Sequence, residues 1–133
     1  MPGKSQYYSD AVLNVLNGLG ITGVAPYVGL FSAAPVNNAA AGTELAGNGY
    51  QRQPITFGAP APDGTGNVQI MSNTSNIQFG PAIADWLQAV AFGIFDAQSN
   101  GNLLYWAALT TPKIVQQGDF GQFAPGSLVV EED

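Results

Sequence analysis

The residues in this sequence that could do acid–base chemistry are almost all carboxylates. The 133-residue chain has no histidine and no cysteine, and it carries nine acidic side chains against three basic ones. Zinc sites built on His or Cys, thiol nucleophiles and imidazole bases are therefore excluded. The Ser-His-Asp and Cys-His hydrolase arrangements are excluded for the same reason. Any catalysis would have to rest on aspartate, glutamate, tyrosine or lysine.

Asp85 and Asp96 are the carboxylates that could form a glycosidase pair. Such a pair needs facing carboxyl groups about 5 to 10 Å apart, and Trp86 and Trp106 could stack on a sugar. The separation of Asp85 and Asp96 in the sequence does not require the two carboxyl groups to face each other in the fold. Asp85 stands in a loop-like stretch, and Asp96 ends an apolar run where an Asx turn would use it. We therefore predict that the protein is not an enzyme, with a carbohydrate-binding sandwich as an alternative that the two tryptophans leave open.

The stretch DAQSNGN, residues 96–102, resembles the opening of a calcium-binding loop. Asp96, Gln98 and Asn100 stand at the first, third and fifth positions, and Gly101 stands at the sixth. The twelfth position, which should carry a bidentate Glu, is Ala107. The flanking residues are strand-like, so a β-turn explains the stretch better. We predict no metal site and no cofactor.

Arg52 lies in the segment GYQRQPITFG and is one of only three basic side chains. Buried arginines are normally paired, often by a bidentate carboxylate. Glu44 is the nearest candidate partner in the sequence, and Asp85, Asp96 and Asp119 are the others. We predict a structural ion pair that ties a loop to the sheet, with a contact to another subunit as the alternative.

Composition restricts the partners of this chain. Charged residues make up 9% of the sequence, the formal net charge is −6, and 46% of the residues are hydrophobic. Binding to nucleic acid through phosphates needs clustered Lys and Arg, and Lys4, Arg52 and Lys113 are far apart. No apolar run approaches the roughly 20 residues that span a bilayer, and the first ten residues lack the apolar core of a signal peptide. We expect no direct nucleic-acid contact, no membrane contact, and synthesis in a cytoplasm without export.

The first twenty residues contain the one clear helix pattern. Tyr8, Val12, Val15, Leu16 and Leu19 recur at spacings of three and four and so share a face. Ser5 could serve as the N-cap, and Gly18 or Gly20 would end the helix in a left-handed turn. We expect this helix either to pack over the end of a β core or to dock as an arm on a neighbouring subunit.

The rest of the chain has the short apolar runs and the turn residues that are typical of a β protein. Apolar residues 87–95 and 103–109 flank an Asn-Gly turn, a strong hairpin signal, and their near-continuous hydrophobicity indicates two central strands buried on both faces. Pro54 confines residues 50–57 to an edge strand or a bulge. Further strands are expected over residues 26–35, 67–73, 75–80, 113–115 and 127–130, with long loops over residues 36–48 and 58–66. Short strands with turns every 8 to 12 residues indicate an antiparallel β sandwich or jelly roll.

The order of the motifs resembles a family of small virion proteins of tailed phages. GTELAGNGYQRQPITF comes first, then NIQFGPAIADWLQAVAFGIFDAQSNGNLLYWAALTTPKIVQQGD, then FAPGSL. The resemblance covers residues 26–128, and members are described either as capsid cement (decoration) proteins or as tail-fibre proteins. It implies a jelly-roll-like sandwich on the outer capsid surface that clamps adjacent copies of the major capsid protein. In such a protein the Gly-Tyr-x-Arg-Gln segment, with Tyr50 and Arg52, would position a loop and fix an edge strand.

We therefore predict one mainly β domain over residues 1–133, with an N-terminal arm at 1–20 and a sandwich at 26–130. The predicted function is a structural virion protein of the capsid surface that acts as a homodimer or homotrimer; a tail or tail-fibre component is the alternative. The expected contact surface is the helix, the two long loops and the C-terminal tail. The structural or interface candidates are Glu44, Tyr50, Arg52, Trp86, Asp96, Trp106 and Asp119.

Overall fold

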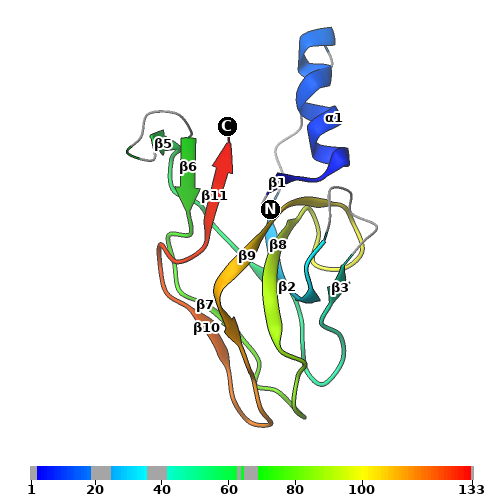
Figure 1. Ribbon diagram of the computed structural model, residues 1–133, viewed down its shortest axis with the longest axis vertical. Coiled ribbons are helices and arrows are strands. Elements are labelled where there is room, and N and C mark those ends of the chain that lie inside the picture. Colours follow the sequence, from blue (N-terminus) through cyan, green and yellow to red (C-terminus); the bar gives the residue numbers. More distant parts are fainter. Residues whose placement is uncertain (1–2, 19–24, 36–41, 63, 65–68, 133) are drawn as a thin grey trace.

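The computed structural model describes residues 3–18, 25–35, 42–62, 64 and 69–132 (Figure 1). One helix near the N-terminus is followed by strands that run to the end of the described chain. The elements are β1 (Gly3–Lys4), α1 (Gln6–Asn14), the 3-10 helix η1 (Val15–Asn17), β2 (Tyr27–Ala33), β3 (Thr43–Glu44), β4 (Gln53–Pro54), β5 (Ala61–Pro62), β6 (Gln69–Ser72), β7 (Ile77–Phe79), β8 (Ala89–Phe95), β9 (Leu103–Lys113), β10 (Gly121–Phe123) and β11 (Val129–Glu132).

The described strands form three antiparallel sheets. The largest has the order β1-β9-β8-β2-β3, and β4 also pairs with β2. Strands β10 and β7 form a two-stranded sheet, and β11-β6-β5 form a three-stranded one. The predicted mainly β class with a single N-terminal helix is confirmed. The jelly-roll order of strands stays a prediction.

The hairpin of β8 and β9 forms the centre of the largest sheet. The two strands pair with Phe92 opposite Ala107 and Ile94 opposite Tyr105. Asn100 and Gly101 in the connecting turn both have left-handed backbone, with φ of 57° and 71°. An Asn-Gly pair adopts this conformation at low cost, because Asn tolerates positive φ and Gly has no Cβ. The hairpin predicted from the sequence is present.

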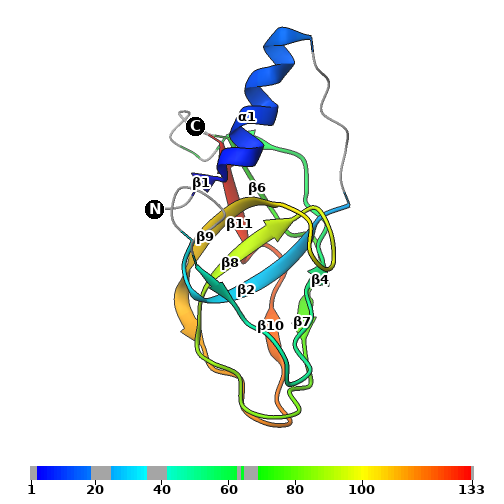
Figure 2. The same cartoon turned by 90° about the vertical axis from the view of Figure 1, so that its right-hand side faces the viewer.

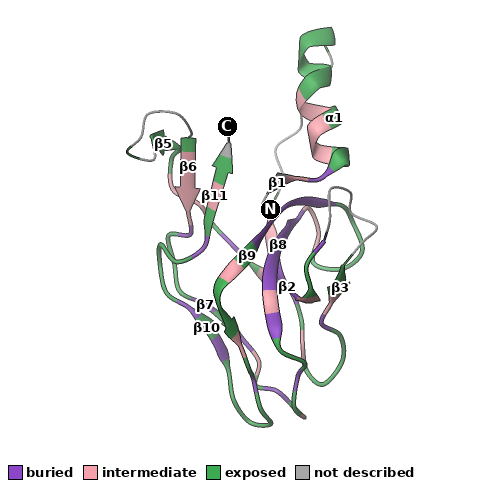
Figure 3. Cartoon of the chain, in the orientation of Figure 1, coloured by how far each residue is buried: buried purple, intermediate pink, exposed green. Residues whose placement is uncertain are grey.

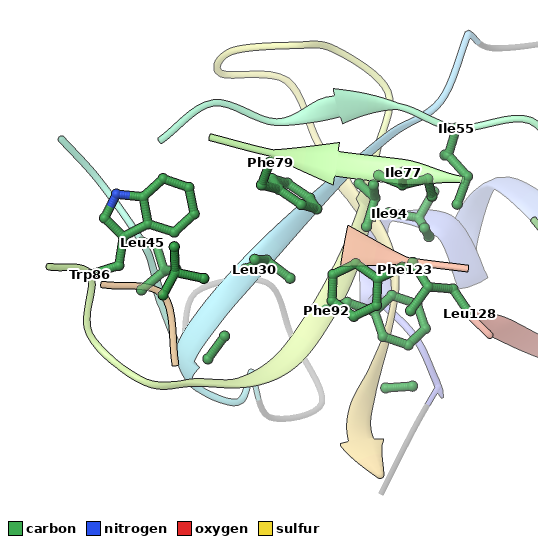
Figure 4. Close-up of a cluster of buried hydrophobic side chains, with 14 of the residues drawn as sticks. Leu30, Leu45, Ile55, Ile77, Phe79, Trp86, Phe92, Ile94, Phe123 and Leu128 are labelled. Atoms are coloured by element: carbon green, nitrogen blue, oxygen red, sulfur yellow. The ribbon is translucent and has the colours of Figure 1, made fainter. Parts of the chain in front are cut away.

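Strand β8 separates two groups of buried side chains, which explains its unbroken hydrophobicity. Phe92 and Ile94 belong to the larger group, whereas Ala91 and Phe95 point to the other face and join the smaller one with Trp106. The larger group lies between the main sheet and the β10-β7 pair, where Phe79 meets Phe123 edge to face (Figure 4). A strand covered on both faces has no solvent-facing positions, so no alternation remains in its sequence.

Asn73 connects the C-terminal segment to this core. Its side chain is 2% exposed. The amide nitrogen donates to the carbonyl oxygens of Ser75 and Ala124, and the amide oxygen accepts from the backbone N–H of Leu128 at 3.0 Å. Asn73 also stands in a formal glycosylation triplet, but its side-chain amide is fully used inside the protein. The residue is therefore a buried structural amide.

The N-terminal helix projects from the sheets. The Ser5 hydroxyl accepts from the backbone N–H of Tyr8 at 3.1 Å, and Gly18 ends the helical segment with φ of 80°, so both predicted caps are present. The Ser5 backbone N–H donates to the carbonyl of Leu104, which fixes the base of the helix to β9. No residue of α1 is buried, and the helix extends away from the body (Figure 2). The prediction that the helix packs over a core end therefore holds only at its base; Leu19 and Gly20 lie outside the described residues.

Three segments differ from the structure predicted for them, one strand and two loops. Residues 50–57 form strand only at β4, because the burial pattern changes phase at Pro54: Arg52 is buried before the proline and Ile55 after it. The two segments predicted as long loops contain the short strands β3 and β5 at Thr43–Glu44 and Ala61–Pro62, whereas residues 36–41, 63 and 65–66 lie outside the described part. Two-residue strands are too short to leave a periodic signal.

The C-terminal half shows three more differences. Leu87 precedes β8 and is 69% exposed instead of buried in a strand. Strand β9 continues to Lys113, so the separate strand predicted at 113–115 does not exist. Residues 121–123 form β10, which pairs with β7 and was not predicted. The strand partners in this half lie far away in the sequence: Lys113 pairs with Ala89, and Gly121 pairs with Phe79.

Candidate functional site

Arg52 is the centre of a buried polar cluster. Its Nε and Nη2 donate to the two carboxylate oxygens of Glu44 at 2.9 and 2.8 Å. Its Nη1 donates to the carbonyl oxygens of Ala97 and Asn100 at 3.0 and 2.7 Å. The guanidinium carbon lies 3.4 Å from the centre of the Phe95 ring. Of the four carboxylates predicted as partners, Glu44 is therefore the one that pairs.

Tyr50 completes the cluster on the side of Glu44. Its hydroxyl donates to Glu44 Oε2 at 2.7 Å and accepts from the backbone N–H of Leu30 at 2.9 Å. Burial, followed by the hydrogen bond to Glu44, raises the pKa of the Tyr50 phenol above its usual value. The phenol therefore stays protonated and remains a hydrogen-bond donor. A catalytic tyrosine base would require the opposite shift.

The cluster requires a glycine at position 29 on β2. A Cβ at Gly29 would lie 2.7 Å from Glu44 Oε2 and 2.9 Å from the Tyr50 hydroxyl. Strand β2 thus passes directly behind the ion pair, and only a residue without a side chain leaves room for it. Sequence reasoning missed Gly29, because its role depends on a close approach that no local pattern reveals.

Asp96 stabilises the turn that Arg52 holds, and it does so through hydrogen bonds to Asn102. The Asp96 carboxylate accepts from the backbone N–H of Asn102 at 2.7 Å and from the Asn102 side chain at 3.0 Å. The backbone hydrogen bond from Asn102 holds the pKa of this carboxyl below its usual value. Arg52 binds two carbonyl oxygens of the same turn, so the two residues support the β8–β9 connection from different sides.

The two tryptophans are core residues. Trp86 is 7% exposed, meets the Tyr50 ring edge to face, and donates its indole N–H to the carbonyl of Asn48 at 2.8 Å. Trp106 is 6% exposed and packs in the smaller buried group with Phe31 and Phe95. Neither ring presents an exposed face on which a sugar could stack, so these two positions do not support the alternative of a carbohydrate-binding sandwich.

The geometry of the cluster is that of a structural site. Arg52 uses all three nitrogens on internal acceptors, and Glu44 receives three hydrogen bonds from Arg52 and Tyr50. Within the part of the chain that the structure describes, no three carboxylates gather where they could hold a metal ion. The described helices are too short and too polar to cross a membrane. The cluster joins the β2, β3 and β4 region to the β8–β9 turn.

A second candidate site lies at the end of the molecule opposite the helix. Four large apolar side chains are exposed there on two adjacent loops, residues 80–88 and 114–120; in Figure 3 much of the ribbon at this end is green, the colour of exposed residues. We call this set the end surface: Ile83 at 70%, Leu87 at 69%, Ile114 at 67% and Phe120 at 47% exposed. Exposed apolar groups that gather in one region indicate a protein-binding surface.

Backbone hydrogen bonds hold the two loops of the end surface together. Ala82 N–H donates to the carbonyl of Asp119 at 3.0 Å, and Gly118 N–H donates back to Ala82 at 2.8 Å. Trp86 N–H donates to the carbonyl of Val115 at 2.9 Å. Ile83 N–H donates to Asn48, whose carbonyl oxygen also binds the Trp86 indole. The apolar side chains therefore stand on a fixed frame.

Asp119 belongs to this frame and lies apart from the Arg52 cluster. Its backbone N–H donates to the carbonyl of Gln116 at 2.9 Å, and the turn exposes its side chain. Sequence reasoning missed the end surface. Leu87 continues the apolar run 87–95, which predicts a strand buried on both faces. The sequence carried one sign that these residues lie on exposed loops. Ile83 comes two residues after the turn pair Gly80-Pro81, and Phe120 directly follows the turn pair Gly118-Asp119.

The fold and the two sites describe a small antiparallel β protein that carries a structural ion-pair cluster and an apolar end surface. The chain matches the family described as podophage GP4 fiber I protein gp80 over residues 3–131. It belongs to that family and is a phage structural protein. A comparison with curated proteins found no matching sequence.

Proposed function

We propose that this chain is a non-catalytic virion subunit of a phage fibre, attached to a neighbouring virion protein through the end surface. The observation that carries the proposal is the set of four exposed apolar side chains on two hydrogen-bonded loops. A preformed apolar surface binds without the entropy cost of ordering a loop. The family description, which names a fibre protein, supports the fibre as the location.

The Arg52 cluster supports the non-catalytic part of this proposal. A general acid or base must reach a substrate, with a pKa near the working pH. The polar atoms of Arg52 and Tyr50 are occupied inside the protein, and the raised pKa of Tyr50 moves it away from base chemistry. The cluster is suited to holding the β8–β9 turn in place.

A capsid clamp is the second proposed function, with the major capsid protein as partner and the outer capsid surface as location. A clamp must contact two neighbours, and exposed apolar side chains lie at both ends of this molecule: the end surface at one, and Leu13 and Leu16 of the helical segment at the other. Many identical weak contacts on a particle would then gain strength through multivalency.

Electron microscopy of phage particles mixed with the labelled, purified protein tests both functions. We expect density on the fibres, and loss of that density for the double variant Ile83→Ser/Ile114→Ser. Val129→Ser removes an exposed apolar side chain elsewhere and should bind like the wild type. Regular density over the shell would instead support the capsid clamp as the function. Undiminished binding of the double variant would remove the end surface as the contact.

A further inference from the structure

The apolar stripe of the N-terminal helix is only half covered. Tyr8, Val12, Val15 and Leu16 lie within one side of the helical segment, since each residue turns by about 100°. Tyr8 and Val12 are half-buried at the base, whereas Val15 is 48% and Leu16 is 85% exposed. The helix projects from the body of the protein (Figures 1 and 2). By the exposure of its residues, the stripe starts over the body and continues beyond it.

A helix of this length gains little stability by itself. Isolated helices shorter than about 12 to 15 residues are marginal in water, and most helical stability in proteins comes from packing of the apolar face. Helix α1 has nine residues and η1 adds three, with none of them buried. The caps at Ser5 and Gly18 stabilise the two ends but leave the outer half of the stripe in water.

An apolar groove of about 290 Å³ lies at the base of the same helix. Ile94, Leu104 and Tyr105 from the large sheet line it, together with Met71 and Val130 from the β11-β6-β5 sheet. Tyr8 from the helix also lines the groove. The charged side chains among its lining residues are Lys4 and Glu131, one of each sign. The groove is therefore suited to an uncharged, apolar occupant.

We propose that the occupant is the tip of α1–η1 from a second copy of this chain, in a symmetric antiparallel pair. The helical segment is about 20 Å long, from a rise of about 1.5 Å per α-helical and 2.0 Å per 3-10 residue. In an antiparallel pair of equal helices, the tip of each lies beside the base of the other, which is where the groove is. Val15 and Leu16 of each copy would thus enter the other copy's groove.

The charge distribution favours a second copy as this occupant. Two chains of net charge −6 repel each other in general, so a self-contact has to avoid the acidic side chains. The sequence has no charged residue between Asp10 and Glu44, so the tip brings no charge into the groove. Asp10 lies on the exposed side of the helix, away from the stripe. A two-fold contact also forms twice, which doubles the area that one short helix covers.

Sedimentation velocity of the purified full-length chain, from about 1 to about 200 µM, tests this proposal over the affinity range of weak protein contacts. We expect a monomer–dimer equilibrium that Val15→Ser/Leu16→Ser weakens at least tenfold. Leu87→Ser removes an exposed leucine, at 69% against 85% for Leu16, from the end surface and should leave the dimer unchanged. A groove variant, Met71→Glu, should also weaken self-association. Mixing it with the tip variant should restore part of the dimer, because one intact tip can then meet one intact groove.

Each other outcome would overturn the pairing. A wild-type chain that stays monomeric throughout the range has no such contact. A dimer that Leu87→Ser disrupts and Leu16→Ser does not would be formed by the end surface instead. A trimer, or a mixture without partial recovery, would rule out the reciprocal tip-in-groove arrangement. Circular dichroism of each variant checks that the fold is retained. Attachment to phage particles is measured separately, so the pairing and the virion role can fail independently.

Discussion

The Arg52 cluster and the end surface differ in what their side chains are left free to do. In the cluster, the ion pair of Arg52 and Glu44 is largely buried, and Arg52 donates to Glu44, Ala97 and Asn100. On the end surface, Ile83, Leu87, Ile114 and Phe120 point into solvent from a fixed frame. In this protein the conspicuous charged group serves the fold, and the surface that we propose as a contact is made of apolar residues.

The largest expected effect comes from Arg52→Ala. The substitution leaves Glu44 with only the Tyr50 hydroxyl as a donor and removes the Arg52 donor from two carbonyl oxygens, and breaking a buried pair costs about 3 kcal/mol of unfolding free energy. Urea denaturation measures the loss. Arg52→Lys should recover only part of it, because an ammonium cannot bind Glu44 in a bidentate way and stack on Phe95.

The same variant also tests whether Arg52 contacts a partner. Folded Arg52→Ala protein should attach to phage particles as well as the wild type does. If attachment is lost while the fold is intact, Arg52 contacts a partner, which is the alternative that its sequence context left open.

Gly29→Ala is expected to have the second largest effect. The added Cβ would lie within 3 Å of both Glu44 Oε2 and the Tyr50 hydroxyl, and forced crowding of this kind costs about 1 to 3 kcal/mol. Thermal or urea unfolding measures it. Gly58→Ala is the matched control, because its Cβ would meet only Thr74 at 3.7 Å and stability should change by less than about 0.5 kcal/mol. Equal stability of the two variants would contradict the close packing behind the ion pair.

Asp96→Asn should have the smallest effect, and one that depends on pH. The pKa of Asp96 is lower in the folded protein than the roughly 3.9 of an unfolded aspartate. Its contribution to stability is therefore fully present above the unfolded value and is lost as the pH falls through the folded one. We expect a cost of about 1 kcal/mol at neutral pH that disappears in acid.

Unfolding measured from pH 7 to pH 2 checks this expectation. Asp10→Asn, on the exposed side of the helix, controls for the loss of one negative charge. A constant difference between wild type and Asp96→Asn over the whole range would show that the carboxylate charge does not stabilise the turn.

Much of the framework could be predicted because it depends on local rules. The Asn100-Gly101 turn, the Ser5 cap and the end of the helix at Gly18 each follow from backbone preferences within a few residues. The pairing of Arg52 with Glu44 follows from the scarcity of charges together with short sequence separation. Each of these features depends on residues that belong to the same short segment of the chain.

The sequence by itself determined the mainly β class, the central hairpin and the residues available for an ion pair, because periodicity, turn chemistry and composition are properties of short segments. Only the tertiary structure decided which apolar side chains remain exposed. Phe92 and Phe120 have the same hydrophobicity, yet β2 and β9 flank Phe92 in the main sheet, while Phe120 lies 47% exposed on a loop. A residue is buried only where a segment distant in the sequence packs over it. The surfaces that can bind a partner therefore exist only in the folded chain.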